Sequence, residues 1–220
     1  MATWRPVTLS LVDRWGPLPP HADRRPPRRG LRRLERLLLV VGVLLLGFWA
    51  YASVEAALYQ RFENRELDAI LQSRAAHVDS PGPGAPRPRP AAGSTIGRIE
   101  IPRLEVSAVV RVGDDARTLQ LAVGHIPGTA LPGQSGNVGL AGHRDTFFRR
   151  LRDIRADDRI RIVTPEGTFD YKVARTDVVE PTDVWVLDDT GGSVLTLVTC
   201  YPFSFVGAAP QRFIVRAELL

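Results

Sequence analysis

The apolar and polar positions of the chain separate a membrane-type segment from a region of short strands. An uncharged apolar run, LLLVVGVLLLGFWAYASV, extends over residues 37–54. In a helix that rises 1.5 Å per residue, this run is about 27 Å long, close to the ~30 Å hydrocarbon thickness of a bilayer. We therefore predict a transmembrane anchor over residues 37–58, with Trp49, Tyr51 and Tyr59 at its far interface as in an aromatic belt.

The residues after the span predict a helical stalk. The stretch EAALYQRFENRELDAILQSRAA consists largely of good helix formers. We place the stalk at residues 59–78. At helical spacing, Leu58, Phe62 and Ile70 are expected to share one face.

A Pro- and Gly-rich spacer follows the stalk. The stretch SPGPGAPRPRPAAG contains five prolines and three glycines, a composition that favours an extended, semi-rigid linker. We place this linker at residues 79–94. Few contacts should cross such a boundary, so residues 95–220 are predicted to fold as a separate domain.

Residues 95–220 show the alternation of half-buried strands. RIRIVT and TFDYKV alternate apolar and polar residues on either side of Pro165-Glu166-Gly167, which predicts a hairpin. VLTLVTC reads as a buried strand and RFIVRAEL as a last strand. Helical stretches are short and are expected at residues 115–122 and in a turn at residues 147–151. The pattern predicts an all-β domain, either a closed barrel or a sandwich.

The positive charge of the chain is confined to its N-terminus. The net charge is +5, yet residues 1–36 alone hold nine arginines against three acidic residues. The other 20 Lys and Arg residues face 21 Asp and Glu residues. A nucleic-acid-binding domain carries its charge on the folded part, so the distribution argues against that partner. With six prolines and no apolar period, residues 1–36 are predicted to form a disordered arm.

The arginines before the apolar run also predict an orientation. By the positive-inside rule, the N-terminus is cytoplasmic and everything after Glu55 lies on the outer face of the plasma membrane. The alternative is a cleaved signal peptide, because Ala50-Tyr51-Ala52 forms an A-x-A pattern after a basic flank. The long arm and the length of the run favour an uncleaved anchor. Both interpretations export the C-terminal domain.

Cys200 is the only cysteine of the chain, so an intrachain disulfide is impossible. It ends the predicted strand VLTLVTC and precedes Tyr201-Pro202, where the strand must leave the ladder because proline donates no hydrogen bond. Such a thiol is either a small core residue or a reactive group placed to meet a substrate. Export favours the reactive group, since an unpaired thiol outside the cytoplasm is open to oxidation.

His143 and Arg212 lie at two further strand boundaries. His143 follows the apolar run NVGLAG, and histidine is the side chain that most readily exchanges protons with a nucleophile near neutral pH. The alternative is a structural histidine in a loop. Arg212 opens the last strand, and its permanent charge suits the stabilisation of an oxyanion. A surface role is the ordinary alternative for an arginine.

His125, in GHIPGTALPG, is a fourth candidate. Together with His143 and Cys200 it offers three zinc ligands, but no short ligand spacing supports a metal site. We expect His125 instead to brace the glycine-rich loop at the edge of the cleft. The glycines of GTALPGQSGNVG match neither a Walker nor a dinucleotide pattern, and we predict no metal and no cofactor.

Taken together, these residues resemble the sortase family, most closely its class D members. The segment TLVTC, which ends at Cys200, fits the family's TLxTC signature, and GHRDT carries His143. Arg212 follows the cysteine by about twelve residues, as the family's pattern requires. TCYPF and GHIPGT are similar to class D more than to other classes. The resemblance covers about residues 95–220.

The resemblance implies an eight-stranded β-barrel with short helices, preceded by the transmembrane helix and stalk. Its cleft would recognise proteins with a C-terminal sorting signal of LPxTG or LPxTA type. Cys200 would attack the Thr carbonyl to form an acyl-thioester, and His143 would act as acid and base. Arg212, with a contribution from Thr199, would hold substrate and oxyanion. An amine of a cell-wall precursor or another protein would resolve the thioester.

Three observations bear on rival functions. The spacer lacks the Asp-Pro-aromatic tripeptide of many pilin-building sortases, which argues against pilus polymerisation. Other exported cysteine peptidases fit less well, because papain-like enzymes place Cys before His and cysteine L,D-transpeptidases carry a Ser-His-Gly-Cys run that is absent here. A non-enzymatic peptide-binding module on a stalk would not need Cys200, His143 and Arg212 together.

Overall fold

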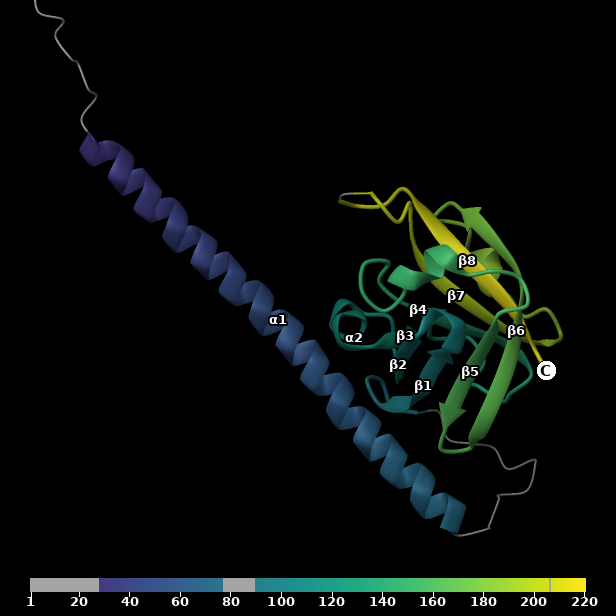
Figure 1. Cartoon of the computed structure of the whole chain (residues 1–220). Helices are drawn as coiled ribbons and strands as arrows, with labels where there is room; N and C mark the ends of the chain where they lie inside the picture. Colours follow the sequence, from purple (N-terminus) through teal and green to yellow (C-terminus); the bar gives the residue numbers. More distant parts are fainter. Residues whose placement is uncertain (1–27, 77–89, 206) are drawn as a thin grey trace, which may run out of the picture. The chain divides into compact units, whose positions relative to one another are not determined.

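The computed structural model describes residues 28–76, 90–205 and 207–220 (Figure 1). The chain divides into two compact units, residues 1–48 and 49–220. The helix α1 (Arg28–Ala76) contributes residues to both units. It begins inside the arm that was predicted to be disordered; the rest of that arm and most of the predicted linker lie outside the described residues.

The second unit contains a closed eight-stranded barrel with the strand order β1-β2-β3-β4-β7-β8-β6-β5. Neighbouring strands are antiparallel except for the parallel pairs β2–β3 and β4–β7. The strands are β1 (Thr95–Ile101), β2 (Val106–Val112), β3 (Val123–His125), β4 (Gly136–Ala141), β5 (Arg159–Thr164), β6 (Gly167–Val179), β7 (Ser193–Tyr201) and β8 (Gln211–Leu219). This architecture confirms the predicted all-β barrel.

Short helices fill the connections of the barrel. They are η1 (Pro102–Leu104), α2 (Ala116–Leu121), η2 (Arg149–Asp153) and η3 (Val184–Leu187). α2 begins where the sequence predicted a helix, because the Asp115 side chain accepts hydrogen bonds from the backbone N–H groups of Arg117 and Thr118. The predicted turn at residues 147–151 is the 3-10 helix η2, which starts two residues later. The predicted hairpin is the β5–β6 pair.

The core lies inside the barrel and is built from alternate residues of each strand. Val138 and Leu140 of β4 and Leu195 and Leu197 of β7 are buried in it. Successive side chains of a strand point to opposite faces. Gly139, Thr196 and Val198 therefore belong to the outer face of β4 and β7, and this face carries the candidate site.

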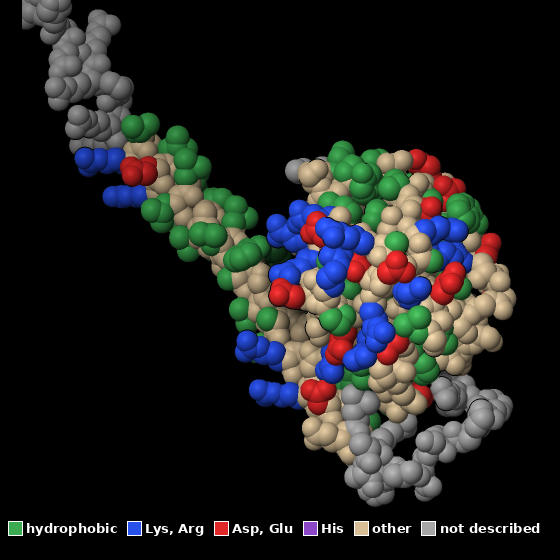
Figure 2. All heavy atoms as spheres, turned by 45° about the vertical axis from the view of Figure 1, so that its right-hand side comes forward, with side chains coloured by type: hydrophobic (Ala, Val, Ile, Leu, Met, Phe, Trp, Pro, Cys, Tyr) green, Lys and Arg blue, Asp and Glu red, His purple; other side chains and the backbone are tan. Residues whose placement is uncertain are grey.

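α1 contains the apolar run that was predicted to span a membrane. Within Gly30–Ile70 the helix is long and apolar enough to cross a bilayer, and its most apolar stretch is not buried against other parts of the protein. The apolar segment of a signal sequence has a similar length and composition. Figure 2 shows hydrophobic side chains along the surface of this helix. Apolar side chains without a protein core around them suit a lipid environment.

Within the second unit, one face of α1 contacts β1. Leu67 is 3% exposed. The Thr95 hydroxyl donates a hydrogen bond to the Glu63 carboxylate at 2.6 Å, and Arg98 forms an ion pair with Asp68 at 3.0 Å. The C-terminal part of α1 is therefore packed against the barrel through both apolar and polar side chains.

The face of α1 that packs is not the one that hydrophobic spacing indicated. Leu58 and Phe62, which were expected to share one face of the helix with Ile70, are 60% and 68% exposed. At 100° per residue, Leu67 lies on the other side of the helix from Leu58. Polar residues such as Glu63 form hydrogen bonds with the barrel, and apolar periodicity cannot detect them.

Candidate active site

Cys200 and Arg212 are direct neighbours on two adjacent strands. The antiparallel register of β7 and β8 pairs Cys200 with Arg212. By strand alternation, Cys200 belongs to the outer face together with Thr196 and Val198. Side chains directly opposite each other on an antiparallel pair have Cβ atoms about 4.5–5.5 Å apart. The thiol and the guanidinium therefore originate side by side at the end of the sheet.

His143 follows the strand on the other side of Cys200. β4 runs parallel to β7 with Ala141 opposite Val198, and the ladder continues for one residue because the Gly142 N–H donates to the Val198 carbonyl at 3.1 Å. Two residues beyond Ala141, His143 reaches the level of Cys200. Strands in a sheet are about 4.8 Å apart, so three neighbouring strands bring His143, Cys200 and Arg212 to one level.

The turn after β4 holds His143 in place. The His143 carbonyl accepts a hydrogen bond from the Phe148 N–H at 3.0 Å, and the Phe148 ring is fully buried. A Cβ at Gly142 would lie 2.7 Å from that ring, a distance that real contacts do not reach. Because position 142 is a glycine, the Phe148 ring can pack directly against the backbone just before His143.

Arg212 is oriented by its own loop. One guanidinium nitrogen, Nη1, donates to the carbonyls of Ala209 at 3.2 Å and Gln211 at 3.0 Å. Among the described residues, no hydrogen bond joins the Cys200 Sγ to His143 or Arg212. Hydrogen bonds between catalytic groups are often loose before substrate binds. The register thus places a thiol, an imidazole and a guanidinium at neighbouring positions at this end of the sheet.

Thr199 faces away from this site. Its side chain is buried, and its hydroxyl donates a hydrogen bond to the Gly142 carbonyl at 2.8 Å. The bond ties β7 to the residue just before His143. The geometry therefore supports a role for Thr199 in holding His143, in place of the predicted contact with substrate or oxyanion.

His125 ends β3 and hydrogen-bonds to the loop that follows this strand, at a distance from Cys200. Its Nε2 donates to the Ala130 carbonyl at 2.8 Å. His125 pairs with Leu140, whose β7 partner is Leu197, three residues short of Cys200. Burial lowers the pKa of His125, against a smaller raising effect of the bond to Ala130, so the imidazole is neutral at neutral pH. We expect it to support the loop.

The metal alternative receives no support from the described residues. They contain no group of three His, Cys, Asp or Glu side chains close enough to hold a metal ion. The register separates the three side chains that were considered as zinc ligands, because His125 lies well back along β3 from the level of His143 and Cys200.

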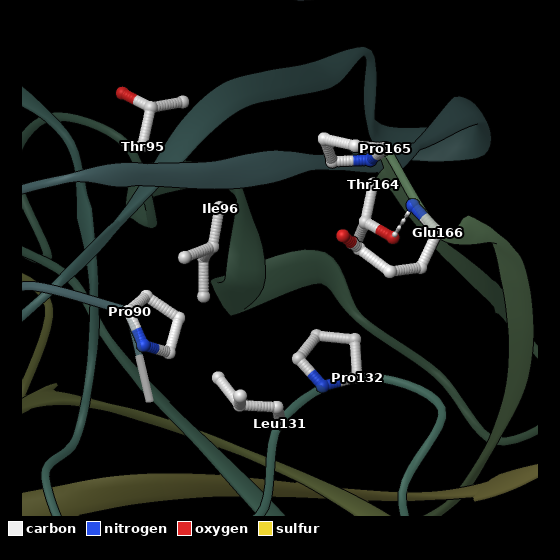
Figure 3. A pocket seen from close by; sticks show the side chains of 8 residues that line it. All are labelled: Pro90, Thr95, Ile96, Leu131, Pro132, Thr164, Pro165 and Glu166. Atoms are coloured by element: carbon white, nitrogen blue, oxygen red, sulfur yellow. Dashed lines mark hydrogen bonds between the residues drawn. The ribbon is translucent and has the colours of Figure 1, made fainter. Parts of the chain in front are cut away.

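An apolar pocket lies at the other end of the barrel. Figure 3 shows Ile96, Leu131, Pro90 and Pro132 around a common space, with Glu166 at its rim. Residues 131 and 132 precede β4, whereas the candidate catalytic residues lie at the C-terminal ends of β4 and β7. This pocket therefore does not belong to the thiol site.

The surface of the barrel carries charges of both signs. Figure 2 shows basic and acidic side chains interspersed on the visible face. Ion pairs join charged residues of the second unit, including Arg150 with Glu105, and Arg161 with Asp170 at 2.9 Å. Pairing of this kind fits the near-neutral charge that the sequence gives outside residues 1–36.

Comparison with known proteins identifies the class. A Sortase domain model matches residues 99–220. Sortase D of Bacillus subtilis (strain 168) is 36% identical over 131 residues, which cover 59% of this chain and 66% of the relative. Sortase SrtE1 of Streptomyces coelicolor is 30% identical over 196 residues, covering 78% of this chain and 53% of the relative. The chain belongs to the sortase family.

Solved structures show the same fold. A Clostridium perfringens Sortase D5 transpeptidase superposes with a TM-score of 0.58 at 26% identity, covering 76% of this chain and 99% of that one. Sortase A of Listeria monocytogenes gives a TM-score of 0.52 at 27% identity, covering 57% and 87%. The chain spans 66% and 53% of the length of the two curated relatives named above.

Sequence reasoning missed two buried polar residues on the sheet face that carries Cys200. Asn137 and Thr196 are buried polar residues on the outer face of β4 and β7, and they hydrogen-bond to each other. The sequence singles out Thr196 only as part of the TLxTC signature. A polar residue in the apolar run NVGLAG was the available signal for Asn137, since a buried amide requires partners.

Proposed function

We propose that this chain is a membrane-anchored cysteine transpeptidase that acts on proteins with a C-terminal sorting signal of LPxTG or LPxTA type. The observation that carries the proposal is the register of β4, β7 and β8, which pairs Cys200 with Arg212 and directs the residues just after β4, including His143, toward the same level. The similarity of the chain to Sortase D of Bacillus subtilis and to the Clostridium perfringens Sortase D5 transpeptidase also supports a transpeptidase reaction.

In the proposed first step, the Cys200 sulfur attacks the carbonyl carbon of the Thr residue in the signal. Negative charge develops on the carbonyl oxygen, and the Arg212 guanidinium stabilises it. The peptide bond then breaks, His143 gives a proton to the departing amine, and a thioester remains on Cys200.

In the proposed second step, an amine attacks the thioester carbonyl. His143 accepts a proton from the amine, a new amide bond forms, and Cys200 leaves as the thiolate. The acceptor is an amino group of a cell-wall precursor or of another protein. No cofactor enters either step, because the two half-reactions exchange one acyl group without oxidation or reduction.

We further propose that α1 anchors the enzyme with its N-terminus in the cytoplasm and the barrel on the outer face of the membrane. The apolar helix and the arginines before it support this orientation. Sorting-signal substrates and cell-wall acceptors would then lie on the same side as Cys200.

The test is an adduct experiment on the full chain in detergent. A sorting-signal peptide with an electrophilic group in place of the scissile carbonyl should label Cys200, as seen by peptide mass spectrometry, whereas a scrambled peptide should not. A peptide library, read by product mass, then defines the signal. Peptide binding without any adduct or cleavage would favour the non-enzymatic binding module instead.

A further inference from the structure

The side chain of Arg144 reaches from the turn after β4 to the connection between β7 and β8. One of its guanidinium nitrogens, Nη2, donates hydrogen bonds to the Phe205 carbonyl at 2.7 Å and to the Gly207 carbonyl at 3.0 Å. The guanidinium carbon also lies 6.0 Å from the centre of the Phe205 ring, at the distance of a cation–π contact. Because β7 lies between β4 and β8, Arg144 joins the turn on one side of β7 to the segment that leaves its end for β8.

The same segment also orients the guanidinium of Arg212. The Arg212 Nη1 donates to the carbonyls of Ala209 at 3.2 Å and Gln211 at 3.0 Å. Two arginines therefore bind backbone carbonyls of one short stretch, Arg144 near its middle and Arg212 at its end. A shift of this stretch would move the carbonyls that hold Arg212 in place.

Arg144 donates these hydrogen bonds from a firmly held turn. It directly follows His143, whose carbonyl accepts a hydrogen bond from the Phe148 N–H at 3.0 Å. The Phe148 ring is fully buried and anchors this turn in the core. Arg144 thus links the turn that carries His143 to the stretch that orients Arg212.

One part of Arg144 is unfavourable for stability. Its second terminal nitrogen, Nη1, is buried and has no hydrogen-bond partner within residues 28–76, 90–205 and 207–220. A buried charged donor without an acceptor costs free energy, so an apolar side chain would serve a purely structural purpose at lower cost. Departures of this kind are expected where a residue is kept for function.

We propose that Arg144 is a positioning residue for Arg212. By holding the Phe205 and Gly207 carbonyls, it fixes the connection between β7 and β8. This connection in turn fixes the guanidinium that stabilises the oxyanion. The inference rests on the proposed function and deepens it, because it adds a residue that acts through Arg212 without touching the reacting carbonyl.

The proposal predicts a loss of turnover without a loss of binding. In Arg144→Met, kcat for fluorogenic peptides carrying Leu-Pro-Ala-Thr-Gly or Leu-Pro-Ala-Thr-Ala should fall about 10–100-fold per folded molecule, the effect of displacing a reacting group by about 1 Å. KM should stay within about twofold, because the interaction of Arg212 grows as charge develops after binding.

Two further variants separate charge from position. Arg144→Lys keeps a positively charged donor on a shorter side chain without the planar group, so it should recover only part of the lost kcat. Arg149→Met is the matched control, because it removes an exposed arginine of η2 with the same change in charge and size. Its kcat should equal that of the wild type.

The decisive measurement is a double-mutant cycle with Arg212→Ala on the full chain in detergent. A residue that acts through Arg212 has little effect once that guanidinium is removed, so adding Arg144→Met to Arg212→Ala should lower kcat by less than about twofold. Product mass accumulated over hours measures these low rates, and circular dichroism gives the folded fraction. An arginine that only stabilised the fold would lower the folded fraction in both backgrounds and leave kcat per folded molecule unchanged.

An unchanged kcat in Arg144→Met, or effects of Arg144→Met and Arg212→Ala that multiply in full, would overturn the proposal. If Arg144→Met does not fold, Arg144→Lys forms the same cycle and the same two outcomes decide. A wild-type chain that neither cleaves the peptides nor forms the Cys200 adduct contradicts the proposed function itself. That result is distinct from an active wild type whose Arg144 variants keep their kcat.

Discussion

Cys200 and His143 occupy one level of the sheet but come from strands that are far apart in sequence. We predict that Cys200→Ala abolishes acyl transfer, because the chain has no other thiol. His143→Ala should lower kcat/KM by about 10²–10⁴-fold, the usual contribution of acid–base assistance. Product formation from a sorting-signal peptide measures both, with circular dichroism as the check on folding. Activity in Cys200→Ala would refute the nucleophile, and near-normal activity in His143→Ala would remove His143 from its role.

Arg212 allows a sharper test, because its interaction with substrate should grow as charge develops on the carbonyl oxygen. Arg212→Ala should lower kcat more than it raises KM, by about 10²–10³-fold. Arg212→Lys keeps the charge but loses the planar fork, so it should recover only part of this loss. A structural arginine would instead lower the melting temperature. A stable Arg212→Ala enzyme with near-normal kcat would exclude Arg212 from catalysis.

The sequence singled out the three candidate catalytic residues because each lies at a boundary of a predicted strand. Strand ends and the TLxTC signature identify Cys200, His143 and Arg212 without any knowledge of the strand order. The sequence could not separate Thr199 from Thr196, since both are threonines of one strand. Their tasks depend on which neighbour lies beside β7, namely Gly142 for Thr199 and Asn137 for Thr196.

The side chain of Gln60 on α1 bridges β2 and the residues just before β3 by hydrogen bonds to their backbone groups. β3 begins at Val123, which pairs with Val110, so the N–H of Val109 has no partner on β3. The Gln60 Oε1 accepts that N–H at 2.9 Å, and its Nε2 donates to the Leu121 carbonyl at 2.6 Å. A side-chain amide thus takes the place of one peptide group in the ladder.

We therefore predict that Gln60→Ala destabilises the second unit. Val109 is fully buried, and an unsatisfied buried backbone group costs about 1–3 kcal/mol. Gln60→Glu should be nearly as harmful, because a carboxylate cannot donate to the Leu121 carbonyl. Arg61→Ala, at an exposed position on the same helix, is the matched control. Thermal unfolding of the full chain in detergent measures all three, and equal melting temperatures for Gln60→Ala and the wild type would contradict the prediction.

At the scale of elements, alternation predicted the barrel strands well and the packing of α1 poorly. Strands such as VLTLVTC and TFDYKV carry their burial pattern in their own residues. The docked face of α1 instead uses Gln60, Glu63 and Asp68, whose partners lie on elements distant in sequence. The closure into a barrel was predictable only through the family resemblance, because strand order depends on contacts that no local pattern records.

At the scale of the molecule, the arginine-rich flank and the apolar run predict a single insertion with the barrel outside. Protease added to intact spheroplasts should digest residues 95–220, whereas an N-terminal epitope should survive until the membrane is opened. The physical reason is the preference for positive charge on the cytoplasmic side. A protected barrel would reverse the orientation. Release of the barrel into the medium would instead indicate cleavage near Ala50-Tyr51-Ala52.

The spacer and the α1 contacts predict different boundaries for the catalytic unit. The Pro- and Gly-rich linker indicates that residues 95–220 fold separately, yet the contacts of Gln60, Glu63, Leu67 and Asp68 cross that boundary. We favour the contacts, because the chain divides at residue 48 and not at residue 95.

A fragment of residues 55–220 should therefore be more stable than one of residues 95–220. Burial of Leu67 and the two hydrogen bonds of Gln60 are together worth about 2–4 kcal/mol, and such a loss lowers the melting temperature of a domain this size by roughly 10 °C. Thermal unfolding of the two fragments measures the difference, and a Gln60→Ala version of the longer fragment should fall between them. Equal melting temperatures would mean that the helix contacts do not stabilise the barrel and that the spacer marks the boundary of the catalytic domain.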